Sequence, residues 1–170
     1  MDPRTAVVVG NPRPGSRTLA AALHVARELS GAEPDLVVDL ADLGAALLDW
    51  QDPAVTALVE EVGRADLVVV ASPTYKATYT GLLKIFLDRF AGGTGLSGLA
   101  VPLMLGAGPA HALAPELTLR PVLAEIGGTT LRGHYVRDSD YDDPAAYAEW
   151  LTSVRPVVSA LLTAPTGVPA

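Results

Sequence analysis

The chain has 170 residues and no cysteine, which excludes disulfides, thiolate metal sites and cysteine nucleophiles. Its 19 acidic and 12 basic residues give a net charge of −7, which argues against nucleic-acid binding. No apolar run approaches the roughly 20 residues of a membrane helix, and residues 1–10 lack the basic start and long apolar segment of a signal peptide, so a cytoplasmic protein is expected.

Strand-like and helix-like patterns alternate along the chain. The strands are predicted from short apolar runs rich in β-branched residues, and the helices from apolar residues at helical spacing. Pro115 and Pro121 are expected to bend the fourth helix. In chain order, the predicted elements are residues 6–9 (strand), 18–29 (helix), 36–40 (strand), 53–64 (helix), 67–71 (strand), 80–90 (helix), 99–105 (strand), 110–126 (helix), 129–136 (strand) and 144–162 (helix), with fraying expected from about residue 163.

This alternation predicts an α/β fold. Five βα units with short connections imply a parallel sheet with helices on both faces. Among doubly wound folds, the five-stranded order 2-1-3-4-5 fits this length better than a six-stranded dinucleotide-binding sheet. No repeat, low-complexity stretch or linker divides the chain, so residues 1–170 are predicted to form a single domain.

The loop between the first predicted strand and helix, GNPRPGSRT at residues 10–18, has the features of an anion site. Such a turn aims backbone N–H groups and a helix amino terminus at one point, where a phosphate can bind without a metal. This loop differs from a Walker A loop, because Ser16 and Arg17 stand where Lys and Ser/Thr are needed. It also lacks the third glycine of the dinucleotide-binding fingerprint. The alternative is a plain turn with Thr18 as helix cap. The candidate phosphate ligands are Asn11, Arg13, Ser16, Arg17 and Thr18.

A second candidate loop, residues 72–80, follows the third predicted strand. A rigid Ser72-Pro73 pair precedes Thr74, Tyr75 and Lys76, which offer backbone amides, an aromatic face and a cation. Those groups suit a flat heteroaromatic ligand, and together with the phosphate loop they point to a flavin. The alternative is an ordinary surface loop with a solvated lysine.

A third loop, residues 106–111, follows the fourth predicted strand. Gly106 and Gly108 permit close approach of the backbone to the edge of a ring. His111 is a candidate ligand contact, although a lone histidine near a helix start is more often a capping or packing residue. His24 and His134 are isolated and lack the spacing of metal ligands, so no metal site is predicted.

The third predicted helix suggests an interface between subunits. It carries an apolar face that includes Phe86, and Tyr79 precedes it, which is more aromatic surface than one sheet face requires. Exposed apolar patches mark interfaces, so a homodimer or a homotetramer is expected. Lys84 and Asp88 stand four residues apart, which is typical of an exposed ion pair and would also allow pairing across an interface.

Three segments, GNPRPGSRT, SPTYKATYTGLLKIFLD and LGAGPAHALAPELTLRPVL, also carry a family resemblance. From about residue 7 to residue 139 the chain resembles the NAD(P)H-dependent FMN reductases of the flavodoxin-like superfamily, above all the flavin reductase components of two-component alkanesulfonate monooxygenases. The second segment is the most specific, because its Pro, Tyr, Lys, Tyr, Gly, Lys and Asp all fall in register with the family pattern.

The resemblance implies a flavodoxin-like fold, FMN as cofactor and NADPH or NADH as reductant. It places the first loop around the FMN phosphate, the residues from Pro73 to Lys76 along the isoalloxazine, and the third loop at the pyrimidine side of the ring. Hydride would pass from nicotinamide C4 to flavin N5 without a catalytic acid or base. The resemblance also implies a homo-oligomer in which Tyr79 approaches a neighbouring active site, and a flavin-dependent monooxygenase as a candidate partner.

Two positions depart from the family pattern. Asn11 stands where serine is usual, and an amide can still donate a hydrogen bond. Leu117 stands where the alkanesulfonate-type reductases carry an inserted tyrosine linked to a π-bulge and to flavin exchange. The interface is therefore expected to pack differently, and the protein to retain some FMN through purification.

Three functions remain open from the sequence. The first is an FMN reductase, the second an FMN-containing quinone or azo-dye reductase on the same scaffold, and the third a non-enzymatic electron carrier of the flavodoxin type. The carrier is the weakest of the three, because Lys76 and its loop replace the aromatic sandwich expected of such proteins.

Overall fold

Six strands form one parallel sheet in the order β2-β1-β3-β4-β5, and β6 pairs with β4 further along the edge that β5 occupies. The structure, a computed structural model, describes residues 3–163. The predicted order 2-1-3-4-5 is confirmed. The fraying expected at the carboxyl terminus falls on residues 164–170, which lie outside the described residues.

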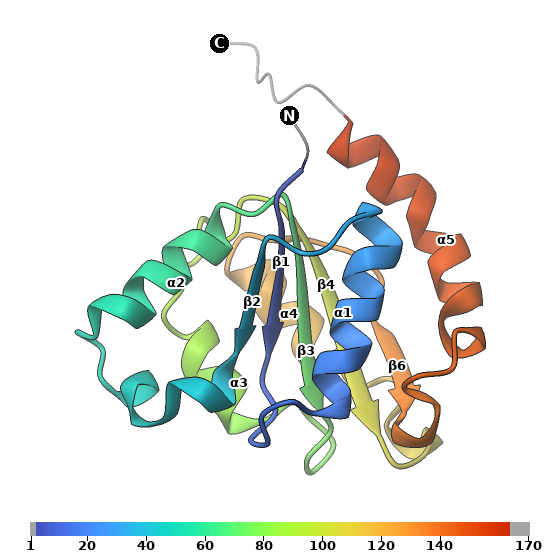
Figure 1. Ribbon diagram of the computed structural model, residues 1–170, viewed down its shortest axis with the longest axis horizontal. Helices are drawn as coiled ribbons and strands as arrows, with labels where there is room; N and C mark the ends of the chain where they lie inside the picture. The colour runs from blue at the N-terminus through green and yellow to red at the C-terminus, as the bar shows by residue number, and fades with distance from the viewer. Residues whose placement is uncertain (1–2, 164–170) are drawn as a thin grey trace.

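The elements follow the predicted alternation (Figure 1). The strands are β1 (Thr5–Val9), β2 (Leu36–Asp39), β3 (Leu67–Pro73), β4 (Leu99–Gly106), β5 (Thr129–Thr130) and β6 (His134–Arg137). The α-helices are α1 (Arg17–Ser30), α2 (Pro53–Gly63), α3 (Gly81–Leu87), α4 (Arg120–Glu125) and α5 (Ala145–Leu162). Shorter helical segments are η1 (Leu40–Leu48), η2 (Pro109–His111), η3 (Pro115–Leu119) and η4 (Asp138–Asp140).

Side chains of the buried strands alternate between two helical layers. On β1, Val7 and Val9 pack in the core shared with α1 and α5, whereas Ala6 and Val8 pack in the core shared with α2, α3 and α4. In Figure 1, α1 lies in front of the sheet and α4 behind it. Burial on both faces explains why β1, β3 and β4 are uninterrupted apolar runs, because neither face meets water.

A bulge divides the fifth predicted strand into β5 and β6. Pairing with β4 stops at Ala100 and resumes at Leu103, while the other strand contains one more residue over this gap. The carbonyl of Ala100 accepts a hydrogen bond from Leu131 N at 3.0 Å. In a strand, backbone groups two positions apart point to the same side, so the residue two positions after Ala100 should also hydrogen-bond to this neighbouring strand. That position is Pro102, which has no N–H to donate, and the ladder is interrupted there.

The helix predicted over residues 110–126 is instead three short pieces, η2, η3 and α4. The η3 segment is a π-helical turn, closed by a hydrogen bond from Arg120 N to Pro115 O. Pro121 lacks the N–H that an α-helix would donate to the Leu117 carbonyl, and its ring would clash with that carbonyl, so the helix widens here. Leu117 is 70% exposed at the centre of this turn, which shows that the widening does not require a tyrosine.

The loops that follow β1, β3 and β4 meet at the lower edge of the sheet in Figure 1, beyond the carboxyl ends of the strands. This edge is where open α/β sheets bind ligands. Among residues 3–163, no helix has both the length and the apolar character needed to cross a membrane.

Candidate functional site

The loop after β1 is held in shape by its own side chains. Asn11 Nδ2 donates to Thr18 Oγ1 at 3.0 Å, and Asn11 Oδ1 accepts from Arg13 N at 2.9 Å. Ser16 caps α1 by accepting a backbone N–H of the first turn at 3.3 Å. The N–H groups of Arg17 and Thr18 open the helix without an intrahelical acceptor, at the positive end of its dipole. The predicted residues therefore form one turn lined with hydrogen-bond donors.

A buried carboxylate lies beside this loop and was missed in the sequence. Asp39 ends β2 with 9% of its surface exposed. Its Oδ2 accepts from Gly15 N at 3.1 Å and its Oδ1 from Ala41 N at 3.4 Å. Gly15 has a φ of +60°, which glycine adopts without strain and which lets its N–H reach the carboxylate. Asp39 could have been found from the sequence as the polar residue at the carboxyl end of β2, because β2 lies next to β1 in the predicted sheet.

The first and second loops are tied together by short contacts. Gly10 N donates to Ala71 O at 2.8 Å, and the Thr80 hydroxyl donates to Gly10 O at 2.5 Å. The same hydroxyl caps α3 by accepting from Leu83 N at 3.1 Å. A Cβ on Gly10 would lie 2.4 Å from the Leu83 Cβ, so only glycine permits this approach. The two candidate loops are therefore fixed relative to each other.

The tip of the second loop is a strained turn. Tyr75 N donates to Thr78 O at 2.8 Å and Thr78 N donates back to Tyr75 O at 3.3 Å. Between them, Lys76 and Ala77 have φ values of +52° and +68°. Positive φ at both central residues is the signature of a type I′ turn, for which Asn-Gly is the preferred pair. Two non-glycine residues hold this unfavourable conformation at a candidate site, where such strain tends to concentrate.

The residues predicted to line a planar ring differ in which of their hydrogen-bonding groups are unpaired and in how far their side chains are exposed. Thr74 N donates to Leu105 O at 2.6 Å and Tyr75 N donates within its turn, so these two amides are not free, contrary to expectation. The Thr74 hydroxyl is buried and has no partner among the described residues, which leaves its hydrogen-bonding capacity unused. Tyr75 is 53% exposed, whereas Pro73 is buried as the last residue of β3. The free groups at this loop are thus a hydroxyl and an aromatic ring.

Tyr135, on β6, shapes the third loop and was also missed in the sequence. Its hydroxyl donates to Gly108 O at 2.6 Å, and burial raises the pKa of this phenol, which stays protonated. A Cβ on Gly106 would lie 2.4 Å from the Tyr135 hydroxyl, so this glycine makes room for the tyrosine, where the sequence suggested room for a ligand ring. Gly108 borders open space, and His111 lies half-buried in η2.

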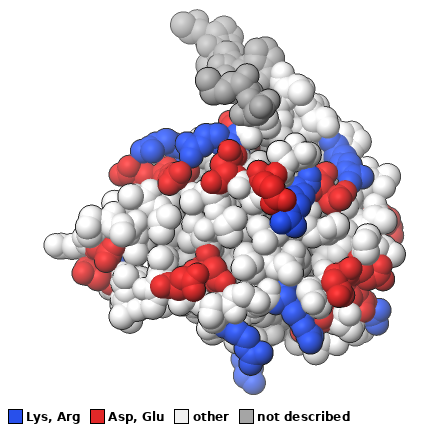
Figure 2. All heavy atoms as spheres, viewed as in Figure 1, with Lys and Arg blue, Asp and Glu red and all other residues white. Residues whose placement is uncertain are grey.

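The basic residues of the loops differ in their surroundings. Arg17 Nη1 donates to the Asp138 carbonyl at 3.4 Å, and its guanidinium lies 5.5 Å from the centre of the Tyr141 ring. Arg13 and Lys76 are exposed. Figure 2 shows basic side chains that project from the lower edge of the molecule, where the strand ends lie in Figure 1.

One of the four residues predicted to form an interface, Phe86, lies in the core instead. Phe86 is 0% exposed and packs in the core against the sheet, so its assignment to an interface is wrong. An apolar face at helical spacing does not reveal what covers it, and here the sheet does. Lys84 and Asp88 form an ion pair on α3 with side chains 44% and 46% exposed, and Tyr79 is half-buried, which raises the pKa of its phenol. An open cleft of about 410 Å³ runs beside this pair, between α3 and α4.

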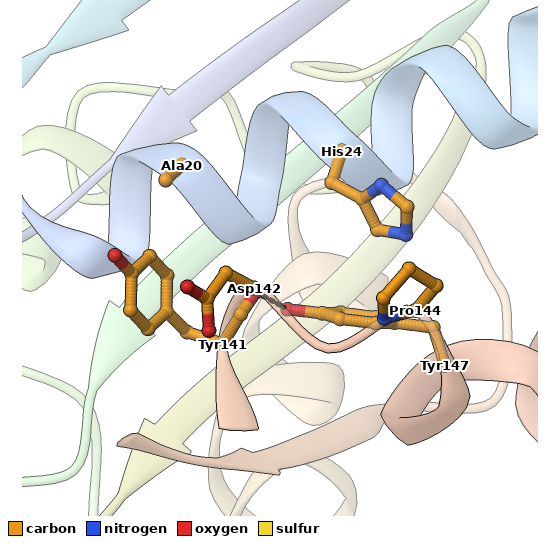
Figure 3. A pocket seen from close by; sticks show the side chains of 6 residues that line it. All are labelled: Ala20, His24, Tyr141, Asp142, Pro144 and Tyr147. Carbon is orange, nitrogen blue, oxygen red and sulfur yellow. Dashed lines mark hydrogen bonds between the residues drawn. The ribbon is translucent and has the colours of Figure 1, made fainter. Parts of the chain in front are cut away.

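A separate cavity of about 220 Å³ lies beside α1 and the start of α5 (Figure 3). His24 contacts Tyr147 edge to face at 4.6 Å between ring centres, and the Tyr147 hydroxyl donates to Tyr141 O at 2.6 Å. None of its lining residues belongs to the three loops. Among residues 3–163, no cluster of histidine and acidic side chains could hold a metal ion. The strand-end loops, by contrast, bring the capped start of α1, the exposed Tyr75 ring and the third loop to one edge of the sheet.

Comparisons with known proteins agree with this geometry. The sequence model of the NADPH-dependent FMN reductase family matches residues 3–142. The chain is 37% identical to an FMN reductase (NADPH) of Pseudomonas aeruginosa over 150 residues, 81% of this chain and 78% of that protein. It is 36% identical to the NADH-dependent FMN reductase SfnF of Pseudomonas fluorescens, over 79% of this chain and 75% of that protein. Among solved structures, the apo form of the NADH:FMN oxidoreductase EmoB superposes with a TM-score of 0.84 at 28% identity, over 96% of this chain and 92% of that one.

Proposed function

The chain belongs to the NADPH-dependent FMN reductase family, and we propose that it reduces FMN with a nicotinamide nucleotide at the strand-end loops. The observation that carries the proposal is the turn at the start of α1. Its hydroxyls and backbone N–H groups converge where the helix dipole favours an anion, and its side chains already hold one another in place.

The residues present fit FMN at both ends of that molecule. At the phosphate end, the Ser16 and Thr18 hydroxyls and the first N–H groups of α1 would donate, with Asn11 fixing the loop. At the ring end, the unpartnered Thr74 hydroxyl supplies a hydrogen-bonding group to the polar edge of the ring, and the exposed Tyr75 ring supplies an apolar contact. Gly108 and His111 would border the pyrimidine side.

Bound FMN would supply the hydride acceptor, N5 of its ring. The residues of the second and third loops would orient the ring beside the nicotinamide, which is catalysis by proximity. The rigid connection between the first two loops, through Thr80 and Gly10, maintains the distance between the phosphate and the ring. Tyr135 would hold the third loop in place through the hydrogen bond from its hydroxyl to Gly108 O.

Assembly and delivery of reduced flavin form part of the same proposal. The cleft between α3 and α4, with Tyr79, Lys84 and Asp88 on or beside α3, supports a homodimer or homotetramer built from these helices. Delivery to a flavin-dependent monooxygenase in the cytoplasm fits an enzyme whose ring-binding loop is exposed at the surface. Light scattering gives the assembly state, and a monomer at micromolar concentration would contradict the interface.

Titration with FMN and riboflavin tests the phosphate site. A hydrogen bond to a charged group contributes about 1.5–3 kcal/mol, so Ser16→Ala should weaken FMN binding roughly 10- to 150-fold. The same variant removes the α1 cap and loosens the loop, but that effect reaches riboflavin equally, so only loss of the phosphate contact separates the two ligands. Ser153→Ala, on an exposed part of α5, is the matched control. Equal affinity of the wild type for FMN and riboflavin would refute the phosphate site, and failure of both NADPH and NADH to reduce bound FMN would refute the activity.

A further inference from the structure

The cavity beside α1 and the start of α5 is large enough for a small molecule. Its volume of about 220 Å³ exceeds the roughly 150 Å³ of an apolar cavity that holds benzene. Figure 3 shows that α1 forms one wall, with Ala20 and His24, and that the chain around the start of α5 forms the other. The second wall consists of Tyr141, Asp142, Pro144 and Tyr147. Mostly apolar and aromatic walls with a few polar groups are typical of a ligand site.

His24 brings an unused hydrogen-bonding atom to this cavity. Its Nε2 is buried and has no hydrogen-bond partner among residues 3–163. The imidazole packs edge to face against the Tyr147 ring, at 4.6 Å between ring centres. Buried side-chain polar atoms usually have a partner, and an exception calls for an explanation such as a bound group. In the tautomer that is protonated at Nδ1, Nε2 is an acceptor, so a ligand with a hydroxyl or an N–H group suits it.

The charges around the cavity favour a cation. Acidic side chains gather near the lower right of Figure 2, over the segment between β6 and α5, which contains Asp138, Asp140, Asp142 and Asp143. Arg137 pairs with Asp140, whereas Asp142, which lines the cavity, makes no ion pair and no side-chain hydrogen bond within residues 3–163. Burial, and after it the charge of Asp142, raises the pKa of Tyr147 to about 12, so the field of this carboxylate reaches the cavity wall.

The two tyrosines add rings that attract cations. The Arg17 guanidinium lies 5.5 Å from the centre of the Tyr141 ring, so one cation already lies against this wall. Arg17 opposes a second cation, but the four carboxylates of the neighbouring segment outnumber it. The Tyr147 hydroxyl donates to Tyr141 O at 2.6 Å, which fixes the two rings relative to each other.

We propose that this cavity binds a small aromatic amine in its protonated form, with the ammonium group beside Asp142 and a ring hydroxyl at His24. In Figure 3, Asp142 lies on the Tyr141 side of the cavity and His24 on the Tyr147 side, so one ring with a short arm connects the two polar groups. A cation also matches a protein of net charge −7. The inference does not depend on the proposed function, because the cavity shares no lining residue with the three strand-end loops.

Calorimetric titration with tyramine, in the presence of saturating FMN, tests the site. Tyramine should bind with a Kd of about 0.1–1 mM, within the range for a ligand of about ten non-hydrogen atoms. Phenethylamine lacks the hydroxyl and para-ethylphenol lacks the ammonium group, and each should bind about 3- to 10-fold more weakly, since one exposed charge pair or one hydrogen bond is lost.

Variants assign each contact. Asp142→Asn should weaken binding of tyramine about 3- to 10-fold and leave para-ethylphenol unchanged, whereas Asp143→Asn, which removes the same charge outside the cavity, should have less than a twofold effect. His24→Phe keeps an aromatic ring against Tyr147 and should weaken binding of tyramine by a similar factor, with phenethylamine unchanged.

Filling the cavity supplies a second line of evidence. Ala20→Leu should abolish binding of tyramine, and Ala57→Leu, at an exposed position of α2, should preserve it. Circular dichroism confirms that both variants are folded. Absence of binding to the wild type, equal affinities for tyramine and either analogue, or binding that survives Ala20→Leu would each overturn the inference. None of these outcomes bears on FMN reduction, which kinetics with NADPH and NADH measure separately.

Discussion

Replacing Ala77 with glycine should stabilise the protein, because Ala77 holds a φ of +68° in the turn of the second loop. The left-handed region costs an L-residue about 1–2 kcal/mol, which glycine avoids. Glycine also widens the unfolded ensemble, which offsets about 0.4–1 kcal/mol of that gain. The free energy of unfolding should therefore rise by roughly 0.5–1 kcal/mol. No packing is lost, since Ala77 is exposed.

Urea unfolding of the flavin-free protein measures this change, and a thermal scan should show a midpoint about 1–4 °C higher. Ala32→Gly is the matched control, because Ala32 is also exposed in a loop but lacks a positive φ. Its free energy of unfolding should fall by about 0.4–1 kcal/mol, the ordinary effect of adding a glycine. A fall of equal size for Ala77→Gly would show that the turn stores no strain and would refute the reasoning.

Two further predictions concern a buried histidine and the contact between loops. Burial lowers the pKa of His134 from 6.5 to about 4, so the stability that its neutral form contributes is complete above pH 6.5 and is lost as the pH falls from 6.5 towards 4, by at most about 3 kcal/mol. His134→Phe keeps a ring beside Trp150 and should flatten the pH dependence of urea unfolding over this range; an unchanged slope would assign it to other groups. Thr80→Val leaves the Gly10 carbonyl and the Leu83 N–H without their partner, so unfolding free energy should fall by about 2–4 kcal/mol. Thr56→Val, at an exposed position of α2, should change it by less than about 0.5 kcal/mol, and a similar loss in both variants would contradict the special role of Thr80.

The sheet and the capped turn after β1 could be predicted because their signals are local. The uninterrupted apolar runs of β1 and β3 are typical of strands buried on both faces, and the short connections between strands and helices predict the parallel order. The turn after β1 depends on the helix start that Ser16 caps, which is also a local property.

The parts that could not be predicted depend on contacts between distant segments. Pro102 interrupts the ladder with the strand that lies beside it, so the bulge is visible only when both strands are placed. Tyr135 enters the site because β6 pairs with the end of β4, and Asp39 because β2 lies beside β1. Phe86 was misplaced for the same reason, since its own helix shows an apolar face but not the sheet that covers it.

The hydrogen bond from Thr80 to Gly10 also has a thermodynamic consequence. With FMN bound as proposed, a group that immobilises one loop would reduce the conformational freedom that the other loop has left to lose, so the two loops would be energetically coupled. The coupling is reciprocal, because phosphate occupancy must favour ring occupancy by the same factor that ring occupancy favours phosphate. A molecule that carries both groups on one chain therefore binds more tightly than its separated halves would suggest, and discrimination in favour of the intact nucleotide arises from the connection between the loops as well as from either loop alone.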